Sequence, residues 1–273
     1  MKLSIITINY NNLVGLKKTY ESVVCQTWTD YEWIIIDGGS TDGSREFIEE
    51  HQDKFAYWCS EPDKGVYNAM NKGIAKAQGD YLNFMNSGDC FYEKDTLEKV
   101  FSLEHQADIL YGDWWQIWGD HENKKSFPHP VEIFSLYKEN ICHQAMFIKR
   151  DFHLKVMYDE SYQILADYKN WANAILKGAT FEYLPLIICK ITMDGISSAE
   201  TTRNKLEYRR LRKELFPPTI LKSMQKMDAL MNEPYQKRVR VLIERGGFPW
   251  LLTRTFLKIM KIFFLRDINE DND

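Results

Sequence analysis

The chain has 273 residues and a formal net charge of −4, with 44% hydrophobic and 27% charged residues. This composition is typical of a folded globular protein and excludes extended disorder as its main state. The slightly acidic balance excludes a generic nucleic-acid binder, which carries a basic excess, so any phosphate binding must be local. The length fits one large α/β domain, or such a domain with an appendage, and we expect the second.

Cysteine usage and hydropathy indicate a cytoplasmic chain without a membrane span. The five cysteines are odd in number and show no C-x-x-C spacing, which predicts neither a disulfide framework nor a structural zinc site. The apolar run that follows Met1 and Lys2 is interrupted too early by asparagines for a secretory signal. The sequence contains no stretch of about 18 uninterrupted apolar residues, which a membrane-spanning helix requires.

Strands and helices alternate at the start of the chain. Residues 3–8 form a continuous apolar run, typical of a parallel strand buried on both faces. The run ends in a polar turn, where Asn11 or Asn12 is placed to cap a helix over 13–26. A second apolar run follows at 33–36, and this order of elements predicts a right-handed parallel crossover.

The second strand ends at Asp37 in a turn rich in glycine, serine and aspartate, which opens a short helix at 45–50. Its glycines allow a backbone to approach a ligand closely, and Asp37 is placed to accept hydrogen bonds from a ribose or base. A capping or turn acid is the alternative on this stretch alone. Neither G-x-G-x-x-G nor G-x-x-x-x-G-K-[ST] occurs, so the pattern is not a dinucleotide fingerprint or a phosphate loop.

Two further acidic turns flank a helix over 66–78 and a strand over 81–86. Asp63 precedes the helix, and Asp89 ends the turn NSGD after the strand. Ligands of open α/β sheets bind at the carboxyl ends of strands, where Asp89 suits a hydrated divalent cation and the phosphates it neutralises. A turn or capping residue is the alternative for an isolated aspartate. Because like charges at three strand ends repel, we expect a cation among Asp37, Asp63 and Asp89.

The second half of the chain contains a strand at 108–111 and a segment over 114–125 with three tryptophans, which predicts a hairpin or loop beside the cleft. Trp114 either stacks on a sugar or packs in the core. His143 precedes a strand at 146–149, and it either holds an acceptor hydroxyl or phosphate oxygen or is a buried structural histidine.

Asp167 lies in the first turn of a predicted helix over 166–177, where stabilisation of the helix dipole is the alternative role for an acid. The strand at 181–186 is expected to close the sheet. The segment 194–198, rich in glycine and serine, is expected to be a loop that closes over substrate.

Several ordered blocks resemble the family 2 glycosyltransferases, which are inverting enzymes with the GT-A fold. The blocks are Thr7, SVVCQTWTDYEWIIIDGGSTDGS at 22–44, SEPDKGVYNAMNKGIAKAQGDYLNFMNSGD at 60–89, ICHQAMF at 141–147 and LADY at 165–168. The resemblance extends to the branch that builds bacterial exopolysaccharide and O-antigen repeat units, including the colanic-acid glycosyltransferases. It covers residues 1 to about 200.

The resemblance implies a mostly parallel α/β sheet flanked by helices over 1–200, with a nucleotide-binding half at 1–89 and an acceptor half at 90–200. It implies a UDP-sugar donor near the base- and phosphate-binding positions Thr7, Asp37, Asp63, Lys64 and Ser87. It makes Asp89 the metal-binding acid of the family's D-x-D motif, with Mn²⁺ or Mg²⁺ as cofactor. Asp167 becomes the catalytic base, and the acceptor-side candidates are His143, Gln144 and Trp114.

The sequence departs from the family pattern at two places. Where many relatives read D-x-D-D, this chain has Asn86 at the first position and a single carboxylate, Asp89, at the last. Asn86 can coordinate through its amide oxygen, with waters and the diphosphate completing the shell, so we expect weak metal affinity without nucleotide. The Glu-Asp pair that often carries the base is Ala166-Asp167 here, which keeps the aspartate.

Beyond residue 200 the pattern predicts a helical extension over 201–273. Within 248–266, Arg254, Lys258 and Lys261 share one helical face, and aliphatic and aromatic residues fall on the other. Such a helix is typical of a membrane interface, and a helix docked on the catalytic domain is the alternative. We expect a protein bound peripherally to the inner face of the cytoplasmic membrane.

The predicted function is inverting transfer of a sugar from a nucleotide-diphosphate donor to a hydroxyl of a lipid-linked glycan, in bacterial surface polysaccharide biosynthesis. A sugar-phosphate nucleotidyltransferase needs a glycine-rich, arginine-containing loop after its first strand, and residues 9–13 contain neither residue. A catalytically impaired nucleotide-sugar-binding subunit is the alternative. Retention of Asp167 argues against it, because a pure binding module has no use for a base.

Overall fold

The computed structural model describes residues 2–132, 134–138, 140–192 and 202–232. The chain divides into two compact units, Met1–Pro217 and Pro218–Asp273. The unit boundary lies later than the expected one at residue 200, because helix α8 (Thr202–Leu215) belongs to the first unit. In the second unit the structure describes helix α9 (Pro218–Asn232). The predicted loop at 194–198 and the predicted membrane helix over 248–266 lie outside the described residues.

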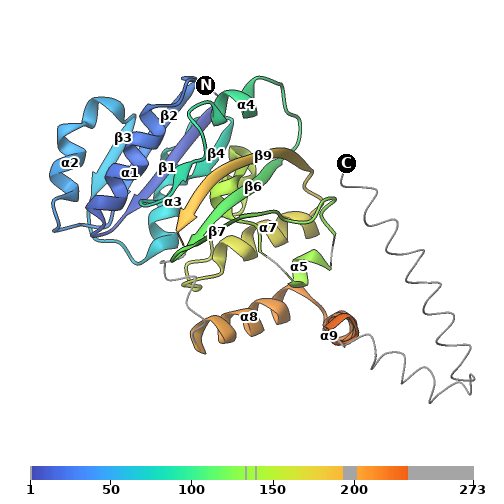
Figure 1. The fold of residues 1–273 in the computed structure, drawn as a ribbon. Helices are drawn as coiled ribbons and strands as arrows, with labels where there is room; N and C mark the ends of the chain where they lie inside the picture. The colour runs from blue at the N-terminus through green and yellow to red at the C-terminus, as the bar shows by residue number, and fades with distance from the viewer. Residues whose placement is uncertain (1, 133, 139, 193–201, 233–273) are drawn as a thin grey trace, which may run out of the picture. The chain divides into compact units, whose positions relative to one another are not determined.

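The first unit is a three-layer α/β structure around one sheet (Figure 1). Its strands are β1 (Leu3–Asn9), β2 (Tyr31–Asp37), β3 (Tyr57–Ser60), β4 (Tyr81–Phe84), β5 (Cys90–Phe91), β6 (Ile109–Trp118), β7 (His121–Lys125), β8 (Met146–Lys149) and β9 (Phe181–Thr192). Its helices are α1 (Leu13–Val24), α2 (Ser44–Glu50), α3 (Val66–Lys76), α4 (Thr96–Phe101), α5 (Ser135–Lys138), α6 (Arg150–Lys155), α7 (Ala166–Leu176) and α8, with short 3₁₀ turns η1 (Gln52–Lys54) and η2 (His143–Ala145).

The strands of the described residues join in the order β3-β2-β1-β4-β8-β6-β9-β5, with β7 paired to β6. The first four strands are parallel, as the alternation of apolar runs and helices predicts. The second half is mixed, because β8 runs antiparallel to both β4 and β6 while β9 runs parallel to β6. The predicted α/β fold with a central sheet is therefore confirmed, with parallel pairing concentrated in its N-terminal half.

Helices cover both faces of the sheet. The apolar residues of β1 alternate between the faces, so that Leu3 and Ile5 join the core beneath α1, α2 and α4, whereas Ile6 contacts α3 on the other face. Helices α6 and α7 also cover this second face, where Trp171 packs against Phe127. Strand β1 is buried along its whole length and runs parallel to β2 and β4, so the polar turn that follows it lies at the carboxyl edge of these strands.

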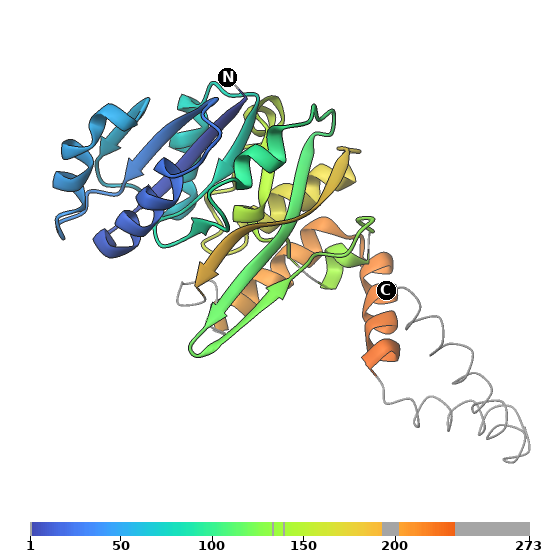
Figure 2. The same cartoon turned by 45° about the horizontal axis from the view of Figure 1, so that its top comes forward.

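The tryptophan-rich segment is a β-hairpin, one of its two predicted forms. Strand β6 continues through Trp118, turns, and returns as β7 (Figure 2). Strand β9 is longer than the predicted 181–186, because it pairs with β6 as far as Thr192 after an irregularity at Gly112 and Asp113. This extension carries Trp114 and its neighbours past the carboxyl edge of the sheet and forms one wall of the site.

Candidate active site

A cavity of about 780 Å³ lies where the exit turn of β4, the hairpin strand β6, the turn η2 and helices α1, α3, α7 and α8 meet. It is lined by seven of the predicted site residues: Asn86, Ser87, Asp89, Trp114, His143, Gln144 and Asp167. The proposed metal-binding turn, the proposed base and the acceptor-side candidates thus share one cavity.

The turn NSGD at 86–89 is fastened by helix α1. The hydroxyl of Thr19 lies 3.1 Å from the carbonyl oxygen of Asn86 and 2.7 Å from that of Asp89, and it accepts a hydrogen bond from the backbone N–H of Gly88. Lys18 Nζ donates to the Gly88 carbonyl at 2.7 Å. The φ of Gly88 is +106°, a conformation that favours glycine. The predicted cap of α1 is also present, since Asn12 Oδ1 accepts from the N–H of Gly15.

Asp89 is held by Gln144 of η2. The Nε2 amide of Gln144 donates to Asp89 Oδ2 at 2.7 Å. Burial raises the pKa of the Asp89 carboxyl to about 6, against the lowering effects of this hydrogen bond and of the positive charges of His143 and Lys18. A carboxylate with a pKa raised in this way gains more than an exposed one when a cation is bound beside it.

Asn86 and Ser87 present polar atoms without protein partners among the described residues. Asn86 Oδ1 and Ser87 Oγ are both buried and make no hydrogen bond there. Buried polar atoms are almost always satisfied, so two orphans in one turn mark a place for a ligand or an ion. The amide nitrogen of Asn86 has a partner, because Nδ2 lies 3.0 Å from Nε2 of His143.

His143 links the turn 86–89 to Asp167. Its Nδ1 lies 3.1 Å from Asp167 Oδ2. Burial by itself would lower the pKa of the His143 imidazole, but the hydrogen bond to Asp167 and the Asp167 charge outweigh burial and raise it. With Nε2 accepting from Asn86, a neutral imidazole carries its proton on Nδ1 and donates it to Asp167.

Asp167 is buried in the first turn of α7, with only 8% of the residue exposed. Its Oδ1 accepts from the backbone N–H of Tyr168 at 2.7 Å and lies 3.2 Å from the Tyr67 hydroxyl. That hydroxyl also lies 2.6 Å from the carbonyl oxygen of Ile164. Burial, followed by the Asp167 charge, raises the pKa of Tyr67 well above its usual value, so the hydroxyl keeps its proton as a donor. Tyr67 lies on the buried face of α3, and local sequence gives no sign that it contacts Asp167.

The remaining predicted nucleotide residues lie outside this cavity. Thr7 is fully buried, and its hydroxyl donates to the Met85 carbonyl and accepts from Trp33 Nε1. Thr7 therefore offers no surface to a base or ribose in this structure. Asp37 is also fully buried: burial would raise the pKa of its carboxyl, but hydrogen bonds from Ser40, Ser60 and Asn9 together lower it. Its hydrogen bonds fix the strand-end turn.

Asp63 and Lys64 lie at the surface beside that turn. A Cβ atom added to Gly38 would come within 2.7 Å of Asp63 Oδ2 and 3.0 Å of the Tyr10 ring, so these side chains border Gly38 closely. Tyr10 is 67% exposed, and Lys64 is exposed as well. An exposed aromatic ring and a carboxylate beside a glycine form a ledge suited to a base and a ribose.

Helix α8 contributes residues that sequence reasoning missed. Asn204 and Tyr208 line the cavity, together with Gln163 from the segment before α7. The apolar periodicity at the start of the extension gave a helix there, but periodicity alone does not tell which domain a helix contacts. None of the helices in the described part of the chain is both long and apolar enough to cross a membrane.

Comparison with protein families gives a match of residues 4–156 to the model described as Glycosyl transferase family 2. An uncharacterized glycosyltransferase of Mycobacterium tuberculosis is 34% identical over 202 residues, which cover 72% of this chain and 77% of the relative. A PGL/p-HBAD biosynthesis glycosyltransferase of Mycobacterium bovis is 34% identical over 172 residues, covering 60% of this chain and 66% of the relative.

Solved structures resemble the fold at low sequence identity. S. aureus TarS 1–349 in complex with UDP-GlcNAc matches with a TM-score of 0.66 at 17% identity, over 79% of this chain and 65% of that structure, just under two thirds of its length. The mannosyltransferase PcManGT from Pyrobaculum calidifontis, in complex with GDP-Man and Mn²⁺, matches with a TM-score of 0.57 at 13% identity. The match covers 96% of this chain and 80% of that structure. The chain is therefore a glycosyltransferase that belongs to family 2 and has the GT-A fold.

Proposed function

We propose that this chain transfers a sugar, with inversion, from a nucleotide-diphosphate donor to a hydroxyl of a glycan acceptor. The observation that carries the proposal is the placement of Asp167 and the turn 86–89 on one cavity, joined through the imidazole of His143. One side of the cavity offers the carboxylate of Asp167, which is suited to proton abstraction. The turn 86–89 on the other side offers buried polar atoms without hydrogen-bond partners among the described residues, beside the buried carboxylate of Asp89.

Asp167 is the proposed base. It takes the proton from an acceptor hydroxyl as that oxygen attacks the anomeric carbon and the bond from that carbon to the diphosphate oxygen breaks. One displacement inverts the anomeric configuration. Tyr67 and His143 hold the two carboxylate oxygens from different elements, so the base is oriented before the acceptor arrives.

The side chains at the turn 86–89 fit a divalent cation with few protein ligands. Asp89 supplies one carboxylate, and Asn86 supplies a buried amide oxygen without a hydrogen-bond partner among the described residues. In that part of the chain no three His, Cys, Asp or Glu side chains group into a metal site. A Mn²⁺ or Mg²⁺ ion at this turn must therefore share its shell with water and the donor diphosphate. When bound, such an ion neutralises charge on the departing nucleotide.

For the donor we propose a UDP-linked sugar, since S. aureus TarS, a fold neighbour, is described in complexes with UDP and UDP-GlcNAc. Ser87 is proposed to contact the diphosphate, and Asp63 and Lys64 the ribose and base at the ledge beside Gly38. Asp37 is assigned a supporting role, because it is buried beneath this ledge.

On the acceptor side we propose Trp114 and Gln144 as lining residues, with His143 acting mainly through Asp167. The proposed acceptor is a lipid-linked glycan of a bacterial surface polysaccharide. The proposed membrane contact is the basic and aromatic segment 248–266, which would place the protein on the inner face of the cytoplasmic membrane. A catalytically impaired nucleotide-sugar-binding subunit is the second candidate, favoured only by the reduced D-x-D motif.

Release of free nucleoside diphosphate from a panel of UDP- and GDP-sugars, with and without Mn²⁺, tests the proposal. We expect metal-dependent release from a UDP-sugar, faster when an acceptor glycan is added. Tight nucleotide-sugar binding without any release or transfer would support the binding subunit instead.

A further inference from the structure

Glu207 on helix α8 holds the backbone that leads into the helix of the proposed base. Its two carboxylate oxygens accept hydrogen bonds from three successive backbone N–H groups: Gln163 to Oε1 at 2.8 Å, and Ile164 and Leu165 to Oε2 at 3.0 and 3.1 Å. A single side chain therefore satisfies a whole run of amides.

These amides lie immediately before α7, where Leu165 is the capping residue and provides no side-chain cap. N–H groups at a helix N-terminus have no intrahelical partner, and the positive end of the helix dipole attracts a negative charge. Glu207 satisfies both requirements from a distant part of the sequence. Its removal would leave three donors without their acceptor beside the first turn of α7.

Asp167 follows this segment by two residues and depends on it for its position. The Ile164 carbonyl lies 2.6 Å from the Tyr67 hydroxyl, which also lies 3.2 Å from Asp167 Oδ1. Movement of the backbone at 163–165 thus shifts the start of α7 and the hydroxyl beside the base together. A displacement of about 1 Å at a catalytic group can cost about 100-fold in rate.

We propose that Glu207 is a positioning residue for Asp167, so that helix α8 contributes to catalysis by fixing the backbone that precedes α7. This inference rests on the proposed role of Asp167 as the base. Glu207 acts through the backbone of 163–165 and does not line the cavity itself.

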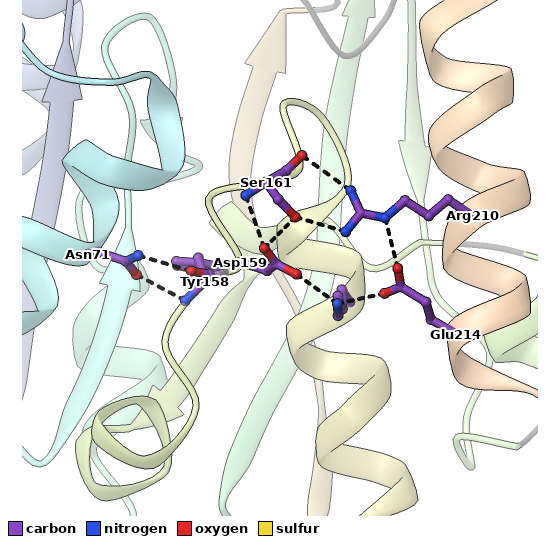
Figure 3. A network of polar contacts seen from close by, with 7 residues as sticks. Asn71, Tyr158, Asp159, Ser161, Arg210 and Glu214 are labelled. Atoms are coloured by element: carbon purple, nitrogen blue, oxygen red, sulfur yellow. Dashed lines mark hydrogen bonds and ion pairs between the residues drawn. The ribbon is translucent and has the colours of Figure 1, made fainter.

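The same helix provides a matched control. Glu214, two turns further along α8, accepts from Lys169 Nζ at 2.6 Å and from Arg210 Nε at 2.8 Å (Figure 3). This network ties α8 to α7 and to the loop at Asp159 and Ser161, but it includes neither the amides of 163–165 nor Asp167. Glu214→Ala removes a carboxylate anchor of α8 and leaves the Glu207 contacts intact.

The experiment compares Glu207→Ala, Glu207→Gln and Glu214→Ala in the full chain. Hydrogen exchange of the 163–169 segment and the kinetics of nucleotide release are measured, using whichever sugar nucleotide of the panel is turned over fastest. For Glu207→Ala we expect faster exchange at 163–165 and a kcat lower by about 10- to 100-fold, with the donor KM within about twofold. Glu207→Gln keeps an acceptor oxygen, so it should recover part of the rate, and Glu214→Ala should stay within about twofold.

Three results would overturn the inference: unchanged exchange at 163–165 in Glu207→Ala, unchanged kcat despite faster exchange, or equal losses in Glu207→Ala and Glu214→Ala, which would indicate general loosening of α8. If Glu207→Ala does not fold, Glu207→Gln decides alone, with full activity counting against the proposal. Failure of the proposed function is seen separately, as an Asp167→Asn variant that releases nucleotide at the normal rate.

Discussion

Asn86 and Asp167 contact opposite nitrogens of the same imidazole ring, that of His143. Asn86 Nδ2 lies 3.0 Å from Nε2, and Asp167 Oδ2 lies 3.1 Å from Nδ1. Asn86, which the family resemblance places at the first acid of the D-x-D motif, is therefore connected to the proposed base. This arrangement differs from what an aspartate would give, because a carboxylate cannot donate to Nε2.

Asn86→Asp should strengthen binding of Mn²⁺ in the absence of nucleotide, because the turn then offers two carboxylates. It should also lower kcat by about tenfold, the equivalent of one lost net hydrogen bond of about 1.4 kcal/mol, since His143 loses the donor that sets its tautomer. Calorimetric Mn²⁺ titration and steady-state kinetics measure the two effects. Asn123→Asp, on the exposed strand β7, is the control. Unchanged Mn²⁺ affinity would contradict a role for position 86 in metal binding.

Asp89→Asn should abolish Mn²⁺-dependent binding of UDP, because the turn 86–89 contains no second carboxylate to replace it. The fold should survive. Asp89 has a native pKa of about 6, above that of an unfolded aspartate, so its ionisation opposes folding above pH 6. The variant should therefore melt no lower than the parent at pH 7 without metal. Calorimetry with UDP and Mn²⁺ and a thermal melt test both points, and unchanged Mn²⁺-dependent binding would refute the metal assignment.

Asp167→Asn should bind the donor normally and transfer sugar about 10²- to 10⁴-fold more slowly, because a positioned base is lost while the hydrogen-bond geometry is nearly kept. Donor affinity by calorimetry and single-turnover transfer separate these effects. Asp151→Asn is the matched control, since Asp151 also lies in the first turn of a helix but is exposed and outside the cavity. Loss of donor binding along with turnover would argue against the role of base.

His153 should make stability depend on pH. Its ring is fully buried without a hydrogen bond among the described residues, and burial lowers its pKa to about 3. An unfolded histidine takes up its proton below about pH 6.5, so between about pH 6.5 and 3 the unfolded state binds the extra proton and stability falls as pH falls. The loss at pH 5 is about 2 kcal/mol.

Urea unfolding of His153→Leu at pH 7 and pH 5 tests this expectation. The variant should lose about 2 kcal/mol less than the parent between the two pH values. His121→Leu, on the exposed strand β7, should keep the parent's pH dependence. The same pH dependence in His153→Leu and in the parent would show that other groups are responsible.

Truncation after Gly247 should move the protein from the membrane pellet to the soluble fraction, on the hypothesis that residues 248–266 bind an anionic surface. Arg254, Lys258 and Lys261 together contribute about 3 kcal/mol at about 1 kcal/mol each. Sedimentation with vesicles of increasing phosphatidylserine content measures binding. The full-length variant with all three changed to Gln should lose the dependence on anionic lipid while staying folded. Aggregation of the truncated protein would favour a docked helix, and indifference of the full chain to vesicles would exclude the membrane hypothesis.

The sequence predicted those elements whose structure is determined by neighbouring residues. The buried strand β1, the Asn12 cap of α1 and the turn that ends at Asp89 follow from apolar runs, capping chemistry and turn residues. Family resemblance, rather than pattern, singled out Asp167.

The parts that were missed depend on contacts between distant segments. Thr7 is buried and accepts a hydrogen bond from Trp33. Tyr67 contacts Asp167 from helix α3, and the spacing of apolar residues on a helix does not distinguish a face that packs in the core from one that lines a cavity. Glu207 sits on a charged helix, where nothing local indicates that it accepts from backbone amides more than 40 residues away. Tertiary partners of this kind are set by the whole fold and leave no periodic signal.

Thr19 fastens the turn 86–89 from a position outside the cavity. Its fully buried hydroxyl contacts the backbone of Asn86, Gly88 and Asp89 from a helix near the start of the chain, and its side chain does not line the cavity. Thr19→Val would remove the hydroxyl that fastens the turn 86–89 and leave every cavity-lining side chain unchanged. Efforts to retune or to inhibit such an enzyme have a target in the packing beneath its active site.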